Sequence, residues 1–181
     1  YYCSDWDFIL SRAEVNGLLI VAEDGTLSAR KVKLDGAEKQ TFTYGIDEIY
    51  DFEFEADAVN QYPTVTSSGW SIKDQKAVTS KAAPVTIPQG NLDGKKLAEA
   101  VGFAEYTLSH PVPIAVDELK AWADARLLRS RLSLVRGRLG TRGFADVKLL
   151  DLIKFDKLGK RFSGKALVTG IAHRVDTDGW R

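Results

Sequence analysis

Apolar residues recur at helical spacing near the start of the chain, and this spacing predicts a helix over Asp5–Val15. Ser4 lies just before the helix and Asp7 three residues later, which is typical of a capping pair. Asn16-Gly17 can end the helix with a left-handed residue. The residues that define the apolar face are Trp6, Ile9, Leu10 and Ala13.

Further along the chain the pattern changes to that of strands. Residues 18–22 and 26–34 flank Asp24-Gly25 and predict a hairpin. In residues 50–57 mainly aromatic side chains alternate with acidic ones, which indicates a strand with one buried aromatic face and one acidic face. Residues 64–72 and 75–80 predict a second hairpin, rich in Thr, Val and Trp.

The remainder predicts two helices and more strands. The helices are expected at 95–101, ended by Gly102, and from Asp117, as a cap, to about Leu132. Residues 103–116 contain two prolines and are expected to be irregular chain or an edge strand. Strands are expected from residue 132 to an end near Gly140-Thr141, at 152–155 and at 165–175, with a turn at 158–161. The expected elements do not alternate as strand, helix and strand, which is the order that would indicate a parallel sheet. The expected fold class is therefore α+β, mainly antiparallel β with three helices.

Charge is balanced over the chain but segregated along it. The 25 basic and 25 acidic residues give a net charge of zero. Residues 1–62 carry −8, residues 63–119 carry −1, and residues 120–181 carry +9. The balance argues against a protein that coats DNA or adsorbs to membranes, and the segregation predicts pairing between the two ends, within one chain or between subunits.

The sequence lacks the residues that disulfide, metal-binding and several kinds of catalytic site require. Cys3 is the one cysteine, and His110 and His173 have no metal-ligand spacing, so we expect no internal disulfide, metal site or cofactor. The sequence contains no phosphate-binding loop and no nucleophile elbow. No apolar run is long enough to span a membrane. The sequence contains no methionine, and we expect an internal fragment of a longer protein.

Two charged segments are the candidate binding residues. The acidic stripe comprises Asp51, Glu53, Glu55 and Asp57. The basic stretch comprises Arg126, Arg129, Arg131, Arg136, Arg138 and Arg142. The stripe could be a solvated or subunit-facing surface, or a pair of glycosidase carboxylates. The stretch could bind nucleic acid, pair with the acidic third across a subunit interface, or face solvent.

Three groups of motifs resemble one family. The first begins Ser-Asp-Trp-Asp-Phe at residues 4–8, and the second is Val-Thr-Ser-Ser-Gly-Trp-Ser at 65–71. The third comprises Arg-Gly-Arg at 136–138, Phe-Ser-Gly-Lys at 162–165, Val-Thr-Gly-Ile-Ala-His at 168–173 and Asp-Gly-Trp at 178–180. Together they resemble the VgrG and phage late control protein D tail hubs, also named Rhs element Vgr proteins. The structural residues of these motifs are Trp6, Phe8, Trp70, Phe162, Gly164, His173, Gly179 and Trp180.

The resemblance implies a non-catalytic, trimeric hub and spike at the tip of a contractile tail or type VI secretion apparatus. Residues 1–115 would form an intervening hub subdomain, and residues 116–181 would contribute a helix and strands to a tail-tube-like β-barrel. Partners would be two further copies, tube and baseplate proteins and a downstream spike domain, with no small molecule. The protein would assemble in the bacterial cytoplasm or a virion tail and be delivered outside the cell or into a target cell. The alternative is a nucleic-acid-binding module using residues 126–142.

Overall fold

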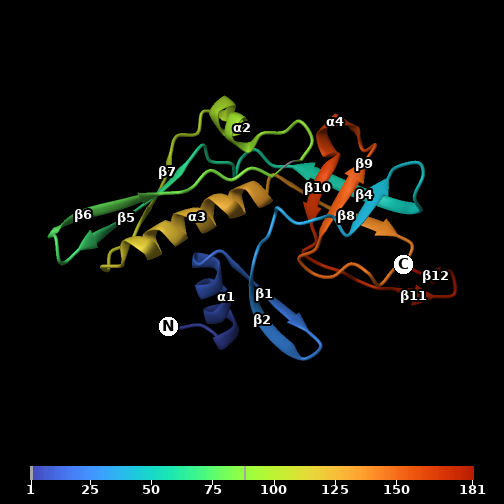
Figure 1. The fold of residues 1–181 in the computed structure, drawn as a ribbon, viewed down its shortest axis with the longest axis horizontal. Helices are drawn as coiled ribbons and strands as arrows, with labels where there is room; N and C mark the ends of the chain where they lie inside the picture. Colours follow the sequence, from blue (N-terminus) through green and yellow to red (C-terminus); the bar gives the residue numbers. More distant parts are fainter. Residues whose placement is uncertain (1, 88) are drawn as a thin grey trace. The chain divides into compact units, whose positions relative to one another are not determined.

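The computed structural model describes residues 2–87 and 89–181, which fold as two compact units (Figure 1). Unit 1 comprises Tyr1–Val32, Asp57–Thr86 and Asp93–Leu134, and unit 2 comprises Lys33–Ala56, Ile87–Leu92 and Val135–Arg181. The chain crosses between the units several times. The expected division before residue 116 falls inside unit 1, because the helix that starts there packs on strands of that unit.

Unit 1 is built around the longest helix, which covers one face of a three-stranded sheet. Strand β5 lies in the middle of this sheet, antiparallel to β6 and parallel to β7. Alternate residues of β5 turn toward the helix, so Val65 and Ser67 are fully buried. The elements of this layer are β5 (Val65–Ser71), β6 (Lys76–Lys81), β7 (Tyr106–Ser109) and α3 (Val116–Leu132).

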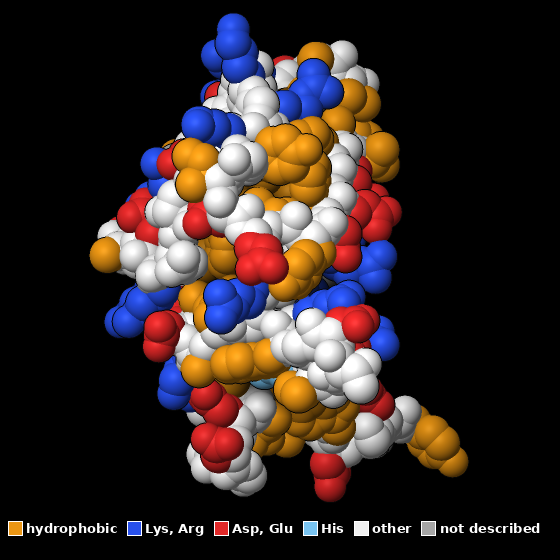
Figure 2. All heavy atoms as spheres, turned by 90° about the vertical axis from the view of Figure 1, so that its right-hand side faces the viewer, with side chains coloured by type: hydrophobic (Ala, Val, Ile, Leu, Met, Phe, Trp, Pro, Cys, Tyr) orange, Lys and Arg blue, Asp and Glu red, His pale blue; other side chains and the backbone are white. Residues whose placement is uncertain are grey.

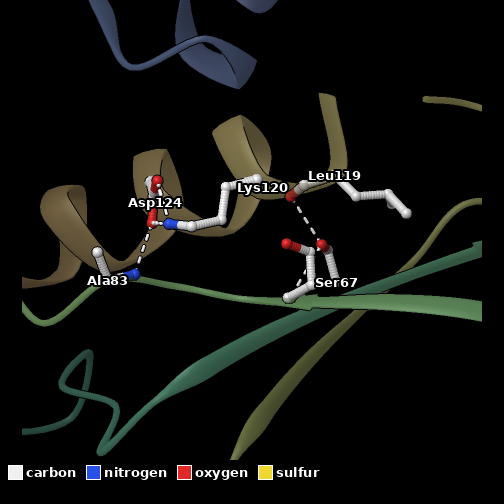
Figure 3. A network of polar contacts seen from close by, with 6 residues as sticks. Ser67, Ala83, Leu119, Lys120 and Asp124 are labelled. Carbon is white, nitrogen blue, oxygen red and sulfur yellow. Dashed lines mark hydrogen bonds and ion pairs between the residues drawn. The ribbon is translucent and has the colours of Figure 1, made fainter. Parts of the chain in front are cut away.

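Polar contacts fasten α3 to this sheet at two points (Figure 3). Ser67 donates its hydroxyl to the Leu119 carbonyl at 2.7 Å, so a buried polar group is satisfied. One turn further along the helix, the Asp124 carboxylate accepts the Ala83 backbone N–H at 2.6 Å. Lys120 pairs with the same carboxylate at 2.6 Å. The helix therefore sits on the sheet in a fixed register.

The rest of unit 1 is a helix, a hairpin and a second short helix, namely α1 (Asp5–Val15), β1 (Leu18–Glu23), β2 (Thr26–Lys31) and α2 (Gly94–Val101). The predicted cap of α1 is confirmed, since Asp7 donates its backbone N–H to the Ser4 hydroxyl at 3.2 Å. The predicted turn at Asp24-Gly25 joins β1 to β2. Gly102, in the left-handed region, ends α2 as expected.

Unit 2 contains three small sheets: β10-β9-β3, β4-β8 and β11-β12. Phenylalanine rings fill its interior, and Phe155 contacts both Phe42 and Phe54, with centroids 6.1 and 5.2 Å away. Its elements are β3 (Gln40–Thr43), β4 (Ile49–Ala56), β8 (Val135–Thr141), β9 (Leu152–Asp156), α4 (Gly159–Phe162), β10 (Gly164–Leu167), β11 (Val175–Asp176) and β12 (Gly179–Trp180).

The α+β class with mostly antiparallel sheets is confirmed, with some corrections. Among the described residues four helices form instead of three, because the expected turn at 158–161 closes into α4. Two pairings are parallel, β5 with β7 and β3 with β9. Asp117 lies in the first turn of α3, and Ala115 occupies the cap position. Among the described strands no sheet closes into a barrel, so the tube-like barrel stays a prediction.

The largest difference concerns the expected long strand over residues 165–175. Strand β10 ends at Leu167, and regular pairing resumes only at Val175. Within the described chain, residues 169–173 have no backbone hydrogen bond. Strand propensity is present there, but no neighbouring strand of the same chain supplies the ladder that a strand requires.

Candidate assembly interface

The acidic stripe and part of the basic stretch meet in the two-stranded sheet β4-β8. Glu53 lies opposite Arg138, and Glu55 lies opposite Arg136 in the antiparallel register. Both pairs form ion pairs, at 2.9 Å for Glu53 with Arg138 and at 3.0 Å for Glu55 with Arg136. Pairing within the chain, one of the two arrangements expected from the segregated charges, is therefore present.

The two ion pairs lie on an exposed face. The side chains of Arg138 and Glu53 are 86% and 76% exposed, so water and salt screen their attraction. The hydrogen bond that Arg138 donates to Glu53 raises the pKa of the guanidinium above its usual value. Asp51, opposite Gly140, is exposed as well. This face fixes the strand register more than it stabilises the fold.

The opposite face of the same sheet is apolar. Phe54 packs on Phe155 and stacks on Phe162, whose ring centroid is 6.0 Å away. The Phe54 ring lies across β8 where a glycine stands, because a Cβ on Gly137 would come within 2.3 Å of the ring atom Cδ1 and 2.2 Å of the Glu53 carbonyl oxygen. Gly137 thus permits a close approach that no other residue would allow.

Three residues of the closing motifs, His173, Gly179 and Trp180, lie in or beside the β11-β12 hairpin. Trp180 donates its indole N–H to the Nδ1 atom of His173 at 3.2 Å, and their rings lie 5.5 Å apart. Gly143 donates its backbone N–H to the Trp180 carbonyl at 2.7 Å, and a Cβ on Gly143 would come within 2.2 Å of the indole ring. Gly179 pairs with Asp176 in the hairpin, and Gly164 opens β10. His173, Gly179 and Trp180 therefore contact other residues of unit 2 and help to form its structure.

A cation–aromatic contact joins the end of the chain to β4. The Arg181 guanidinium lies 5.3 Å from the centre of the Tyr50 ring. Tyr50 donates its hydroxyl to Glu48 at 2.9 Å, and this hydrogen bond raises the pKa of the tyrosine. Tyr50 remains about half exposed. The start of β4 therefore presents an aromatic surface beside exposed charges.

The helical part of the basic stretch behaves differently. Arg131 is buried, donating to the Gln61 side-chain oxygen at 3.0 Å and to the Tyr62 carbonyl at 2.7 Å. Burial lowers its pKa. Arg126 lies beside stacked tyrosines, 5.0 Å from the Tyr106 ring centre, and donates to the Tyr62 hydroxyl at 3.3 Å. These two arginines are part of the unit 1 interior.

The other candidate residues are on the surface. Arg129 forms an ion pair with Glu14, Arg142 is exposed, and Asp57 is half-buried at the end of β4. The first two motifs also lie outside the core: Trp6, Phe8 and Trp70 are 47%, 39% and 48% exposed. These three aromatic residues belong to unit 1, whereas the β4-β8 sheet belongs to unit 2.

Charge nearly cancels within each unit. Unit 1 has 13 acidic and 12 basic residues, and unit 2 has 12 acidic and 13 basic residues. The −8 and +9 segments therefore combine within the units, because β4 and the preceding acidic residues share unit 2 with residues 135–181. Five of the six arginines of the stretch are buried, aromatic-bound or ion-paired, which leaves no continuous basic track for a phosphate backbone.

The described residues offer no group of three His, Cys, Asp or Glu side chains that could hold a metal ion. His110 packs edge-on against Trp122, and its Nδ1 atom lies 2.8 Å from the Val112 carbonyl oxygen. In the stripe, Glu53 and Glu55 are ion-paired to arginines. In the part of the chain with described positions, no helix is both long and apolar enough to cross a membrane.

Solved structures of tail proteins share this fold. The tail protein from Neisseria meningitidis MC58 superposes with a TM-score of 0.65 at 16% identity, over 99% of this chain and 52% of that one. The 43 kDa tail protein of prophage MuSo2 from Shewanella oneidensis gives 0.66 at 11% identity, over 95% and 51%. This chain thus shares the fold of these two tail proteins and spans about half of their length.

The family is shown by sequence. The model of the Alg8 N-terminal domain matches residues 1–177, and the chain belongs to this family. No curated protein matches the sequence. The phage-tail part of the expected resemblance is supported by the fold, and the VgrG-like hub stays a prediction.

Proposed function

We propose that this chain is a non-catalytic structural component of a contractile injection apparatus, in the trimeric hub at the tail tip. The observation that carries the proposal is the fold, which two phage tail proteins share over nearly the whole chain. The closing motifs add support, because Trp180 contacts both His173 and the backbone of Gly143, which gives the two motif residues a structural role.

In this proposal the protein works mechanically. Two further copies complete the hub, tube and baseplate proteins contact it, and a spike domain of the full-length protein lies beyond it. A tube-like barrel would form when the small sheets of unit 2 are extended by neighbouring chains. The nucleic-acid alternative is not favoured, because most arginines of residues 126–142 already have partners within the chain.

The test is the composition of tail-like particles released by the cells that make this protein. We expect its peptides in the purified particles at about three copies per tube end, as cyclic symmetry of the hub requires. Gold-labelled antibodies against the chain should mark one end of each tube. Absence from the particles, or label spread along their length, would contradict the hub assignment.

A further inference from the structure

The sheet β4-β8 has an open edge on its β4 side. Asp57 donates its backbone N–H to the Leu134 carbonyl at 2.9 Å, and the register runs without a break from there to Asp51. In an antiparallel ladder alternate residues bond the partner strand. Phe52, Phe54 and Ala56 therefore direct their N–H and C=O groups away from β8, and no described residue bonds them there.

Apolar side chains lie next to this edge. Tyr44, Ile46, Tyr50 and Phe52 are exposed, with Ile46 at 71%, and the Tyr44 and Phe52 rings meet edge-on at 5.4 Å. Figure 2 views the side on which β4 and the C-terminal strands lie in Figure 1, and it shows apolar side chains in groups between charged ones. An exposed, apolar edge strand of this length is a template for pairing with another strand.

The same unit contains a segment suited to fill such an edge. Residues 169–173 have unpaired backbone groups within the described chain, and residues 169–175 are exposed throughout. The sequence Thr-Gly-Ile-Ala-His-Arg-Val contains β-branched residues and no acid. In a strand, Ile171, His173 and Val175 would share one face, and Arg174 would lie on the other.

The two faces of the segment match the two faces of β4. Ile171 and Val175 would lie beside the exposed Phe52 ring, while Arg174 would lie beside Asp51 and Glu53. Pairing of β4 with a second β4 would instead place the acidic residues of both strands on adjoining positions, which is destabilising. Charge therefore selects a head-to-tail contact between unlike surfaces, and contacts of this kind close into a ring when the rotation between successive copies closes.

We infer that β4 of one copy binds residues 169–175 of a second copy as an added strand. This inference rests on the proposed assembly role and names the surfaces that join the subunits. The segment gains its missing hydrogen bonds, and the β4-β8 sheet gains a third strand, in the manner of β-strand addition. It also accounts for the exposed residues 169–173, which have strand propensity but no strand partner within the described chain, next to β11, which pairs with β12 on its other side.

Cysteine cross-linking of the chain tests the contact by position. Variants are made in a Cys3→Ser background, since Cys3 is exposed. Glu53→Cys protein is mixed with Ala172→Cys protein and oxidised gently, and the chains carry different tags so that mixed dimers can be counted. The matched control replaces Glu53→Cys with Thr79→Cys, on β6, which is also an exposed edge strand but lies in unit 1.

We expect mixed dimers at least several-fold above the Thr79→Cys control. Adding Ile171→Pro to the Ala172→Cys protein should abolish them, because proline removes a donor from the added strand. Its melting temperature should not change, since the Ile171 backbone bonds no described residue. A yield no higher than the control, or a predominance of Glu53→Cys homodimers, would overturn the inference.

The outcome separates this inference from the proposed function. A chain found in tail particles that gives no mixed dimers keeps the hub role and loses the strand contact. Mixed dimers from a chain that is absent from such particles keep the contact and remove the hub role. A loss of melting temperature in the Ile171→Pro protein would show that the segment is already paired within one chain, and would also overturn the inference.

Discussion

Two parts of one basic stretch have opposite environments. Arg126 and Arg131 point into unit 1 from α3, where they contact tyrosine rings, a glutamine and a backbone carbonyl. Arg136 and Arg138, a few residues later on β8, face solvent and pair with glutamates across the strand. Arg126 and Arg131 donate hydrogen bonds to polar groups within unit 1, whereas Arg136 and Arg138 form ion pairs on a solvent-exposed face. Sequence proximity and equal charge therefore say little about the energetic role of an arginine.

The largest difference should appear on removing one arginine from each part. Arg131→Met leaves the Gln61 side-chain oxygen and the Tyr62 carbonyl without their donor in a buried place, and we expect a loss of about 2–3 kcal/mol in the free energy of unfolding. Arg136→Met removes an exposed ion pair and should cost about 0.5 kcal/mol or less. Urea unfolding of both variants makes the comparison, and equal losses would contradict it.

Two glycines on β8 test how closely β4 and β8 pack. We call the exposed ion pairs Glu53–Arg138 and Glu55–Arg136 between these strands the exposed ladder. A Cβ on Gly137 would meet the Glu53 backbone oxygen at 2.2 Å, whereas a Cβ on Gly140 would meet only the Asp51 carboxylate, at 2.8 Å. Backbone cannot move as a side chain can, so we expect Gly137→Ala to cost about 1–3 kcal/mol. Gly140→Ala should cost clearly less.

Thermal unfolding of the two alanine variants measures this difference. If both variants melt alike, the close approach of Phe54 to β8 is not what holds the strands together. A further check is the Phe54 environment, since near-ultraviolet circular dichroism should change in the Gly137 variant alone.

Much of the local structure follows from the sequence. The bounds of α1, the turn at Asp24-Gly25 and the end of α2 at Gly102 are predictable, because caps and turns depend on a few adjacent residues. Residues 168–174 were predicted as strand and are not, because a strand depends on a partner that local sequence does not reveal. Strand β7 confirms the edge-strand alternative for residues 103–116, but its pairing was not predicted, because its partner β5 lies some forty residues earlier and runs parallel to it.

In the candidate interface, too, some features could be predicted from the sequence and others could not. Alternation in residues 50–57 predicted an acidic face and an aromatic face, and both exist, although Phe52 is 43% exposed instead of buried. The burial of Arg131 was missed, yet a signal was present. Leu119, Ala123, Leu127 and Arg131 recur every four residues, so Arg131 continues the buried stripe of α3. A charge at a core position of a periodic helix indicates a buried polar contact.

The stabilisation from the exposed ladder should depend on salt concentration, whereas that from the buried Arg131 should not. A double-mutant cycle with Glu53→Gln and Arg138→Gln measures the coupling free energy between the two side chains. We expect a small favourable coupling at low salt that falls toward zero as the salt concentration approaches about 1 M, where the screening length is about 3 Å. The stability loss of Arg131→Met should vary much less over this range, because its partners are neutral and buried. A salt-independent coupling would show that the ladder is shielded from solvent.

The smallest expected effect concerns another ion pair of unit 2. Lys165 on β10 lies 2.7 Å from Glu38, and its hydrogen bond lowers the pKa of that carboxyl below the usual value of 4.5. Because the pKa is lower in the folded state, the pair stabilises the fold above the unfolded pKa, and this contribution is lost as the pH falls through the folded value. In Lys165→Gln the pKa of Glu38 should return toward 4.5, as seen by carboxyl carbon NMR titration. Lys160→Gln, an exposed lysine of α4 in the same unit, is the matched control and should leave this titration unchanged. A Glu38 titration that is the same in all three proteins would mean that the contact with Lys165 does not persist in solution.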